Sequence, residues 1–192
     1  AGATTPTLAA PGDVCASAVR TVRYDVVAMK LDIPLNGWGD HVPEGVVFAL
    51  ANGDASPSAE DLRAEPGRVS PLVMRAAVGD CLKVTLTNRL DARRVGMHVD
   101  GVMKDVSSDG ARIGRNEDST VAPGGTRTYT WFAQRAGQFA VNDYGSGTGF
   151  GMTEPSTDTP SHGLYGGLVV LPAGFRWTDP VTGRDLLVRD PD

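Results

Sequence analysis

The feature that most restricts the fold is a series of short apolar segments separated by turn-forming residues. The clearest segment is CLKVTLT, residues 81–87, in which Leu82, Val84 and Leu86 alternate with other side chains. Side chains that alternate in this way lie on one face of a β-strand. The chain also contains 24 Gly and 13 Pro, which are typical of turns between strands. These patterns predict an all-β fold with long loops and little helix, in which two sheets pack as a sandwich.

The same signals divide the chain into expected elements. A strand is predicted over Arg20–Ile33, and VVFAL, residues 46–50, predicts a buried strand. One helical turn is expected over residues 58–64, where Ser58 would cap the first turn. The remaining expected elements are strands at 72–76, 81–87, around 98, at 126–132, 136–143 and 164–172, and a hairpin around 180–183.

The length of 192 residues fits one domain with additional segments. We interpret residues 1–18 as an N-terminal arm, 19–172 as the folded domain and 173–192 as a C-terminal tail or linker. The loop at 144–163 is rich in Gly, Ser, Thr and Pro. It is longer than a connection between two strands needs, which is typical of functional or disordered loops.

Composition disfavours two classes of partner. The net charge is −5 and the Lys and Arg residues are scattered, which argues against a nucleic-acid-binding protein. The sequence contains no apolar run of about 18 residues, so no membrane-spanning helix is expected.

The N-terminal segment and the two cysteines suggest export. The segment AGATTPTLAAPGD consists mostly of small residues and looks like a mature end after signal removal. We therefore expect a secreted or extracytoplasmic protein. In that compartment the simpler interpretation of Cys15 and Cys81 is one disulfide, with two free thiols as the alternative. Closing so long a loop would stabilise the fold by roughly 3–4 kcal/mol.

Five segments together resemble a known family. VGDCLKVTLTNRL (78–90), GMHVDGV (96–102), VAPGGTRTYTWFA (121–133), GQFAVND (137–143) and SHGLYGGLVVLPAG (161–174) follow one another in the order found in cupredoxin domains of multicopper oxidases. The chain looks most like an N-terminal domain of the large bacterial members that are similar to ceruloplasmin and hephaestin. The similarity runs from about Tyr24 to Gly183. It implies a Greek-key β-sandwich and, for an assembled oxidase, copper-dependent oxidation of metal ions or phenolic compounds by O₂.

This chain departs from the family at the copper-binding motifs. The family's first His-x-His-Gly motif corresponds to HVDG, so that His98 matches the first ligand and Asp100 stands in place of the second. The next His-x-His motif corresponds to a segment that carries Asn142 and Asp143. A blue copper site requires a cysteine just before the last strand. That segment contains Met152 and His162 but no cysteine.

The sequence therefore predicts that this chain lacks complete copper sites. Its three histidines, His41, His98 and His162, are fewer than the family's trinuclear copper centre requires. The preferred interpretation of His98 is a remnant that bonds to nearby backbone. The alternative is a weak metal site formed by His98, His162 and a carboxylate from Asp100 or Asp143, if the long loop folds back. His41 is expected on a surface loop.

Two functions remain open. In the first, the chain is a copper-poor cupredoxin-like domain or subunit that packs against other cupredoxin domains or chains of a larger oxidase. In the second, it is a stand-alone secreted binding or assembly module that has lost copper chemistry, with a homo-oligomer as the alternative to other cupredoxin partners. A third and less favoured hypothesis is a small mononuclear copper protein. An exposed apolar patch near Trp131, Phe150 or Trp177 would indicate a missing neighbour and favour the first function.

Overall fold

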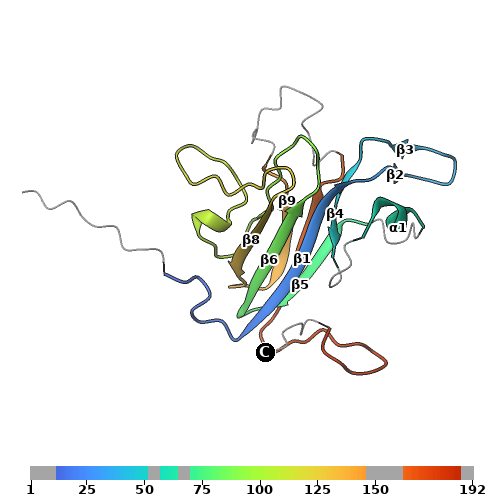
Figure 1. The fold of residues 1–192 in the computed structure, drawn as a ribbon. Helices are drawn as coiled ribbons and strands as arrows, with labels where there is room; N and C mark the ends of the chain where they lie inside the picture. Colours follow the sequence, from blue (N-terminus) through green and yellow to red (C-terminus); the bar gives the residue numbers. More distant parts are fainter. Residues whose placement is uncertain (1–11, 52–56, 65–69, 146–161, 187–192) are drawn as a thin grey trace, which may run out of the picture.

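Two four-stranded sheets form the framework of the described protein (Figure 1). The computed structural model describes residues 12–51, 57–64, 70–145 and 162–186. Phe150 and Met152, and most of the loop at 144–163, lie outside these ranges. No helix in the described ranges is long and apolar enough to cross a bilayer.

The first sheet has the strand order β4-β1-β6-β8. Its members are β1 (Arg20–Lys30), β4 (Val46–Leu50), β6 (Asp80–Asn88) and β8 (Thr126–Phe132). Strands β1 and β6 run parallel, whereas β4 pairs with β1, and β8 with β6, in the antiparallel sense. The parallel pairing of β1 with β6 places strands from distant parts of the sequence at the centre of the sheet.

The second sheet has the order β5-β10-β9-β7. It contains β5 (Leu72–Ala77), β7 (His98–Val99), β9 (Gly137–Asn142) and β10 (Tyr165–Leu171). The smaller elements are the hairpin of β2 (Ile33–Pro34) with β3 (His41–Val42), the helix α1 (Ala59–Ala64) and a 3-10 turn at Val106–Ser108. The described residues thus form the all-β cupredoxin-like sandwich that the sequence predicted, with one short helix.

Local predictions agree with most of these bounds. The predicted cap is present, because the Ser58 hydroxyl accepts a hydrogen bond from the Asp61 N–H at 3.1 Å. The strand predicted over Arg20–Ile33 is divided between β1 and β2. His41 lies exposed in β3, with its Nδ1 2.7 Å from the Asp32 carboxylate.

The prediction of a buried strand at residues 46–50 was wrong in one respect. Strand β4 lies at the edge of its sheet and pairs only with β1. Val46 and Phe48 are buried, but Leu50 is 37% exposed. An apolar run of five residues does not distinguish an edge strand from a central one, because neighbours from elsewhere in the chain decide its position.

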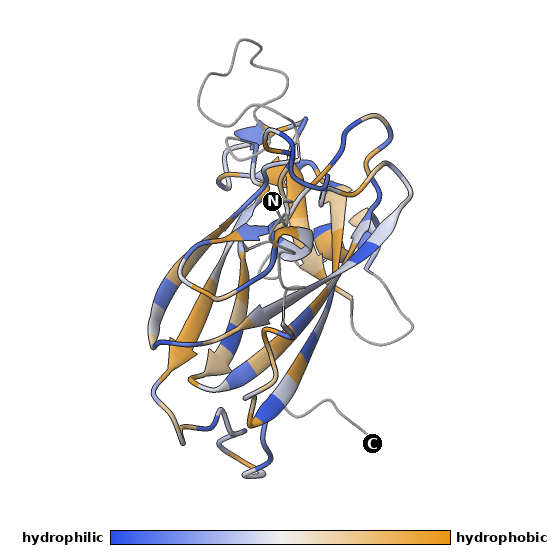
Figure 2. Cartoon of the chain, turned by 90° about the vertical axis from the view of Figure 1, so that its left-hand side faces the viewer, coloured by the Kyte–Doolittle hydropathy of each residue, from blue (hydrophilic) through white to orange (hydrophobic). Residues whose placement is uncertain are grey.

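The main core lies between the two sheets and follows the alternation of their strands (Figure 2). Leu82, Val84 and Leu86 of β6 are all completely buried there. Trp131 is also completely buried, and its Nε1–H donates to the Ser108 carbonyl at 2.9 Å. Trp131 therefore does not contribute to an exposed apolar patch, because β8 turns this ring inward.

A buried tyrosine makes the stability depend on alkaline pH. Tyr129 is completely buried, donates its hydroxyl to the Ser119 carbonyl at 2.8 Å and stacks on Trp131. Burial raises the pKa of the Tyr129 phenol from 10.0 to about 12. Between these pH values the unfolded chain loses the proton that the folded chain keeps, so the free energy of unfolding falls as pH rises.

We expect this loss to total about 2–3 kcal/mol between about pH 10 and pH 12, with the full contribution present below that window. Urea unfolding followed from about pH 9 to pH 12 measures it. The variant Tyr129→Phe should lose this part of the pH dependence while costing about 1 kcal/mol near neutral pH. An unchanged slope in Tyr129→Phe would assign the alkaline loss to other groups.

Interactions at the start of β1 hold the N-terminal segment to the sheet. Cys15 and Cys81 form a disulfide with a Cα–Cα distance of 5.5 Å. Arg20 donates to both carboxylate oxygens of the buried Asp80, at 3.0 and 2.6 Å, and contacts Asp185 at 3.2 Å. The C-terminal segment is therefore also tied to β1, whereas the boundaries proposed at residues 18 and 172 remain predictions.

Candidate functional site

The two segments that correspond to the family's first copper motifs lie side by side. Strand β7 pairs with β9 so that His98 lies opposite Asn142 and Val99 opposite Val141. The strands belong to one edge of the second sheet, and the chain continues from them to Asp100 and Asp143. The four residues at the positions of the family's copper ligands therefore lie in a single region. They are His98, Asp100, Asn142 and Asp143.

Both ring nitrogens of His98 face oxygen acceptors. Nδ1 lies 2.8 Å from the Asp109 carbonyl and 3.2 Å from the Asp109 carboxylate, while Nε2 lies 3.2 Å from the Asp100 carboxylate. The ring is tilted against Tyr144, with centroids 4.6 Å apart, and the side chain is 12% exposed. A ring nitrogen that donates a hydrogen bond cannot use the same position to bind a metal ion.

A lysine balances part of the negative charge near His98. The Lys104 ammonium lies 3.5 Å from the Asp109 carboxylate and donates to the Val99 carbonyl at 2.7 Å. The Asp100 side chain, in contrast, is 76% exposed. Hydrogen bonding and charge pairing on the Asp109 side orient the imidazole, which is the arrangement expected for a structural histidine.

The side chain of Asp143 forms hydrogen bonds to backbone groups. This buried carboxylate accepts hydrogen bonds from the N–H groups of Gly96 and Gly145 on one oxygen, both at 2.7 Å. The two glycines and Gly110 allow close approach of three chain segments, since a Cβ on Gly96 would collide with the Gly110 carbonyl and one on Gly145 with Val95. Asp143 therefore joins the segment before β7 to the segment after β9.

His162 lies in another part of the fold. Its carbonyl accepts a hydrogen bond from the Val46 N–H at the start of β4, at 2.9 Å. Its Nδ1 is buried and has no hydrogen-bond partner among the described residues. Within those residues no group of three or more His, Cys, Asp or Glu side chains has the geometry of a metal site. The site predicted from His98 and His162 remains a prediction.

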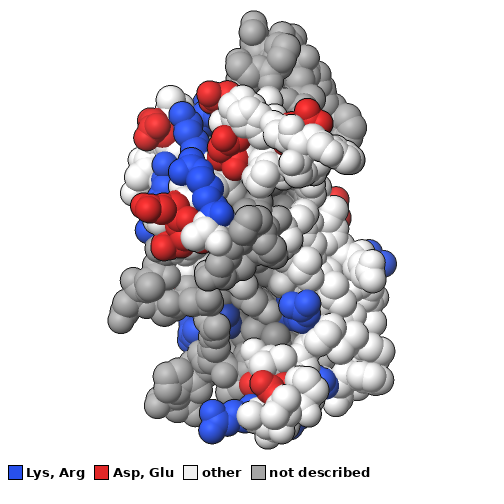
Figure 3. Space-filling view, turned by 90° about the vertical axis from the view of Figure 1, so that its right-hand side faces the viewer, with Lys and Arg blue, Asp and Glu red and all other residues white. Residues whose placement is uncertain are grey.

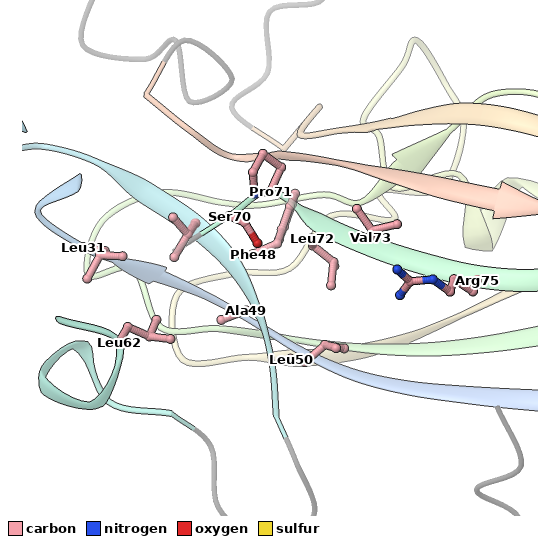
Figure 4. Close-up of a pocket in the computed structure, with 11 residues that line it drawn as sticks. Leu31, Phe48, Ala49, Leu50, Leu62, Ser70, Pro71, Leu72, Val73 and Arg75 are labelled. Carbon is pink, nitrogen blue, oxygen red and sulfur yellow. The ribbon is translucent and has the colours of Figure 1, made fainter. Parts of the chain in front are cut away.

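A groove that the sequence analysis missed lies between the edge strands β4 and β5. One hollow of about 360 Å³ has apolar walls from both strands, from Leu31 and from Leu62 of α1 (Figure 4). A second hollow of about 350 Å³ adjoins it, shares Leu50, Val73 and Arg75 with it, and also contacts Trp177. Of the three places where an exposed apolar patch would indicate a missing neighbour, Trp177 lies at this hollow, which also has charged lining residues.

Solved structures share the fold, although no family model matches the sequence and a search of curated proteins gives no significant match. A multicopper oxidase from Pseudomonas thermotolerans is 25% identical with a TM-score of 0.52, over 84% of this chain and 32% of that one. A copper nitrite reductase from Nitrosomonas europaea is 22% identical with a TM-score of 0.54, over 80% and 42% of the two chains. A laccase from Pediococcus acidilactici is 17% identical with a TM-score of 0.52, over 80% and 27%.

The chain thus spans about a third of the length of the oxidase that it matches at 25% identity. The matches to the nitrite reductase and the laccase, at lower identity, concern the fold. The strand order, the paired segments of β7 and β9, and the match to the oxidase together show a cupredoxin-like fold that is similar to a domain of multicopper oxidases.

Proposed function

We propose that the chain is a copper-poor cupredoxin-like domain that serves a structural or interdomain role in an assembled multicopper oxidase. The observation that carries this proposal is the hydrogen bonding of His98, whose two ring nitrogens face the oxygens of Asp109 and Asp100. The single histidine in the paired motif segments is held within the fold through its Nδ1, and those segments supply no second imidazole. The oxidation of metal ions or phenolic compounds would then belong to the assembled protein.

The neighbouring donor groups do not fit a copper centre either. The Asp143 carboxylate binds two backbone N–H groups, and Asn142 offers an amide, a poorer copper ligand than imidazole. If copper is present in the assembled protein, we propose that complete sets of ligands come from other domains or chains.

The alternative is a stand-alone secreted module. The apolar groove between β4 and β5 favours the first function over this alternative, because an independent module would be expected to present a closed polar surface. An extracytoplasmic location is part of the proposal and is supported by the disulfide between Cys15 and Cys81.

Copper content measured after incubation with Cu(II) chloride and desalting tests the proposal. We expect far less than one copper per chain, because the described residues bring together no group of three or more His, Cys, Asp or Glu side chains with the geometry of a metal site. The matched variants are His98→Ala, which removes the family-type ligand, and His41→Ala, which removes an exposed histidine remote from the motif segments. Neither should change the copper content.

About one copper per chain that is lost in His98→Ala and kept in His41→Ala would overturn the copper-poor assignment. It would instead support the mononuclear copper protein. The assembly part of the proposal is tested separately by the native mass in the source. A species with the mass of this chain alone would favour the stand-alone module.

A further inference from the structure

Strand β4 has one edge on which some backbone groups have no partner among the described residues. Asp25 and Ala51 form a hydrogen-bonded pair, as do Leu31 and Gly45. The backbone N–H and C=O groups of Val47 and Ala49 in β4 therefore point toward β1. The alternation of an antiparallel ladder then directs the N–H and C=O groups of Val46, Phe48 and Leu50 away from β1. The Val46 N–H binds the His162 carbonyl, but Phe48 and Leu50 have no backbone partner on that side among the described residues.

The hollows follow this edge. The 360 Å³ hollow is lined by the consecutive residues Val47, Phe48, Ala49 and Leu50 (Figure 4). Successive side chains of a strand point to opposite faces, so a cavity that contacts all four lies along the strand edge. A further hollow of about 70 Å³ adjoins at Val47 and Phe48 and extends to Tyr165. Together with the hollow at Trp177, the groove is elongated along β4.

The opposite wall is β5, which contributes the charge. The Tyr24 hydroxyl donates to the Arg75 carbonyl at 2.7 Å and accepts from the Arg75 N–H at 2.9 Å, which occupies the outer backbone groups of β5 at that position. The Arg75 guanidinium lies over the Trp177 ring, 4.9 Å from its centroid. No described carboxylate forms an ion pair with it. Arg75 is the one charged residue that lines the 360 Å³ hollow.

Charge is unevenly distributed on the side of the molecule that carries β4, β5 and α1 (Figure 1 and Figure 3). Acidic and basic side chains gather together in one part of this face, and much of the remaining described surface is uncharged with isolated basic and acidic residues. The 360 Å³ hollow, with Arg75 as its one charged lining residue, is complementary to an apolar ligand that carries a carboxylate. The adjoining hollow at Trp177 is also lined by Arg23 and Asp25.

From the free edge of β4 and from Arg75 we propose that this groove binds an extended polypeptide segment that adds to β4 as a further strand. Its backbone pairs with Phe48 and Leu50, alternate apolar side chains fill the hollows, and an Asp or Glu side chain binds Arg75. The inference rests on the proposed function, because the neighbouring domains or chains of the assembled oxidase are the source of the segment.

A peptide strand fits better than a small apolar carboxylate. A small molecule would fill one hollow and leave the N–H and C=O groups of Phe48 and Leu50 without partners. An extended chain uses both features, because strand addition takes its affinity from main-chain hydrogen bonds and its specificity from pockets for alternate side chains. It would also cover an exposed edge, which sheets commonly protect.

The probe is a fluorescein-labelled peptide, Thr-Val-Thr-Val-Glu-Val-Thr, titrated with the full chain and followed by fluorescence anisotropy. We expect saturable binding, weakened about tenfold in Arg75→Gln. The peptide with Gln in place of Glu should bind the original protein about tenfold more weakly than the Glu peptide does. Its affinity for Arg75→Gln should not be lower still, because the ion pair is already absent. The control variant Arg115→Gln alters an exposed arginine outside the groove and should bind as the original protein does.

Changes in the peptide test the backbone pairing without altering the protein. Two peptides are compared, each methylated at alternate backbone nitrogens so that the N–H donors of only one strand edge are removed. Binding should be abolished in the peptide methylated on the edge that pairs with β4, and nearly intact in the peptide methylated on the opposite edge. Absence of saturable binding up to about millimolar concentration would overturn the proposal. Equal binding of both methylated peptides would contradict pairing with the backbone of β4. If palmitate also displaces the probe, the groove would be assigned to a small molecule.

These outcomes are independent of the copper measurement. A chain that binds copper but also binds the peptide would contradict the proposed function and leave the groove intact. A chain without copper that fails to bind the peptide would contradict the groove alone.

Discussion

Replacement of Asp143 by alanine is expected to lower the free energy of unfolding by about 2–6 kcal/mol. The Asp143 carboxylate is 3% exposed and accepts hydrogen bonds from the Gly96 and Gly145 N–H groups, both at 2.7 Å. Alanine leaves two buried donors without this acceptor, and each costs about 1–3 kcal/mol. Urea unfolding at neutral pH, monitored by tryptophan fluorescence, measures the change because Trp131 is buried in the core.

Two matched variants identify the cause. Asp143→Asn keeps a side-chain oxygen that can accept both hydrogen bonds, so we expect it to lose less than Asp143→Ala. Asp100→Ala removes the other carboxylate of the motif region, whose side chain is 76% exposed, and should cost about 0–1 kcal/mol. An Asp143→Ala protein as stable as Asp100→Ala would show that the glycine N–H groups find other partners.

The contrast between these two aspartates illustrates what sequence patterns can predict. The resemblance placed Asp100 and Asp143 at equivalent ligand positions, and both were candidates for one metal site. Their environments differ because Gly96 and Gly145 come from separate segments that meet only in the folded protein. A motif records the residue type at a position, but burial and hydrogen bonding depend on these distant neighbours.

The strands were largely predictable because their signal is local. The alternation at Leu82, Val84 and Leu86 describes one face of β6 and requires no knowledge of the other strands. The position of each strand in its sheet is a different matter. Neither the exposed edge of β4 nor the inward orientation of Trp131 has a local signal, since both follow from the pairing of β1 with β6 and of β6 with β8.

The groove was missed for the same reason. Arg75 alternates with the buried Met74 and Ala76, which by itself indicates an ordinary outward-facing residue of a strand. Only the fold brings Arg75 beside Leu50 and Trp177 and leaves β4 and β5 both at sheet edges. The signal that could have suggested a surface is the pair of outward-facing apolar residues at Leu50 and Val73, which are 37% and 40% exposed.

Removal of the disulfide is expected to destabilise the fold by about 4 kcal/mol. Cys15 and Cys81 are separated by 66 positions, and cross-linking them reduces the conformational freedom of the unfolded chain over that whole interval. The comparison is between the oxidised protein and the double variant Cys15→Ser/Cys81→Ser, both unfolded in urea. The variant should have a lower midpoint and a slightly larger dependence of stability on urea, because its unfolded chain exposes more surface.

The reduced original protein separates the effect of the bridge from that of the serine side chains. Cys81 is 1% exposed, so a serine hydroxyl buried there adds a cost of about 1–3 kcal/mol that the thiol does not. We therefore expect the reduced protein to lie between the oxidised protein and the double variant. Arg20 and Asp80 continue to hold the start of β1 against β6 in all three forms, so each should fold to the same sandwich. Equal stability of the oxidised and fully reduced proteins would mean that the unfolded chain is already restricted between residues 15 and 81, and the entropic account of this bridge would be wrong.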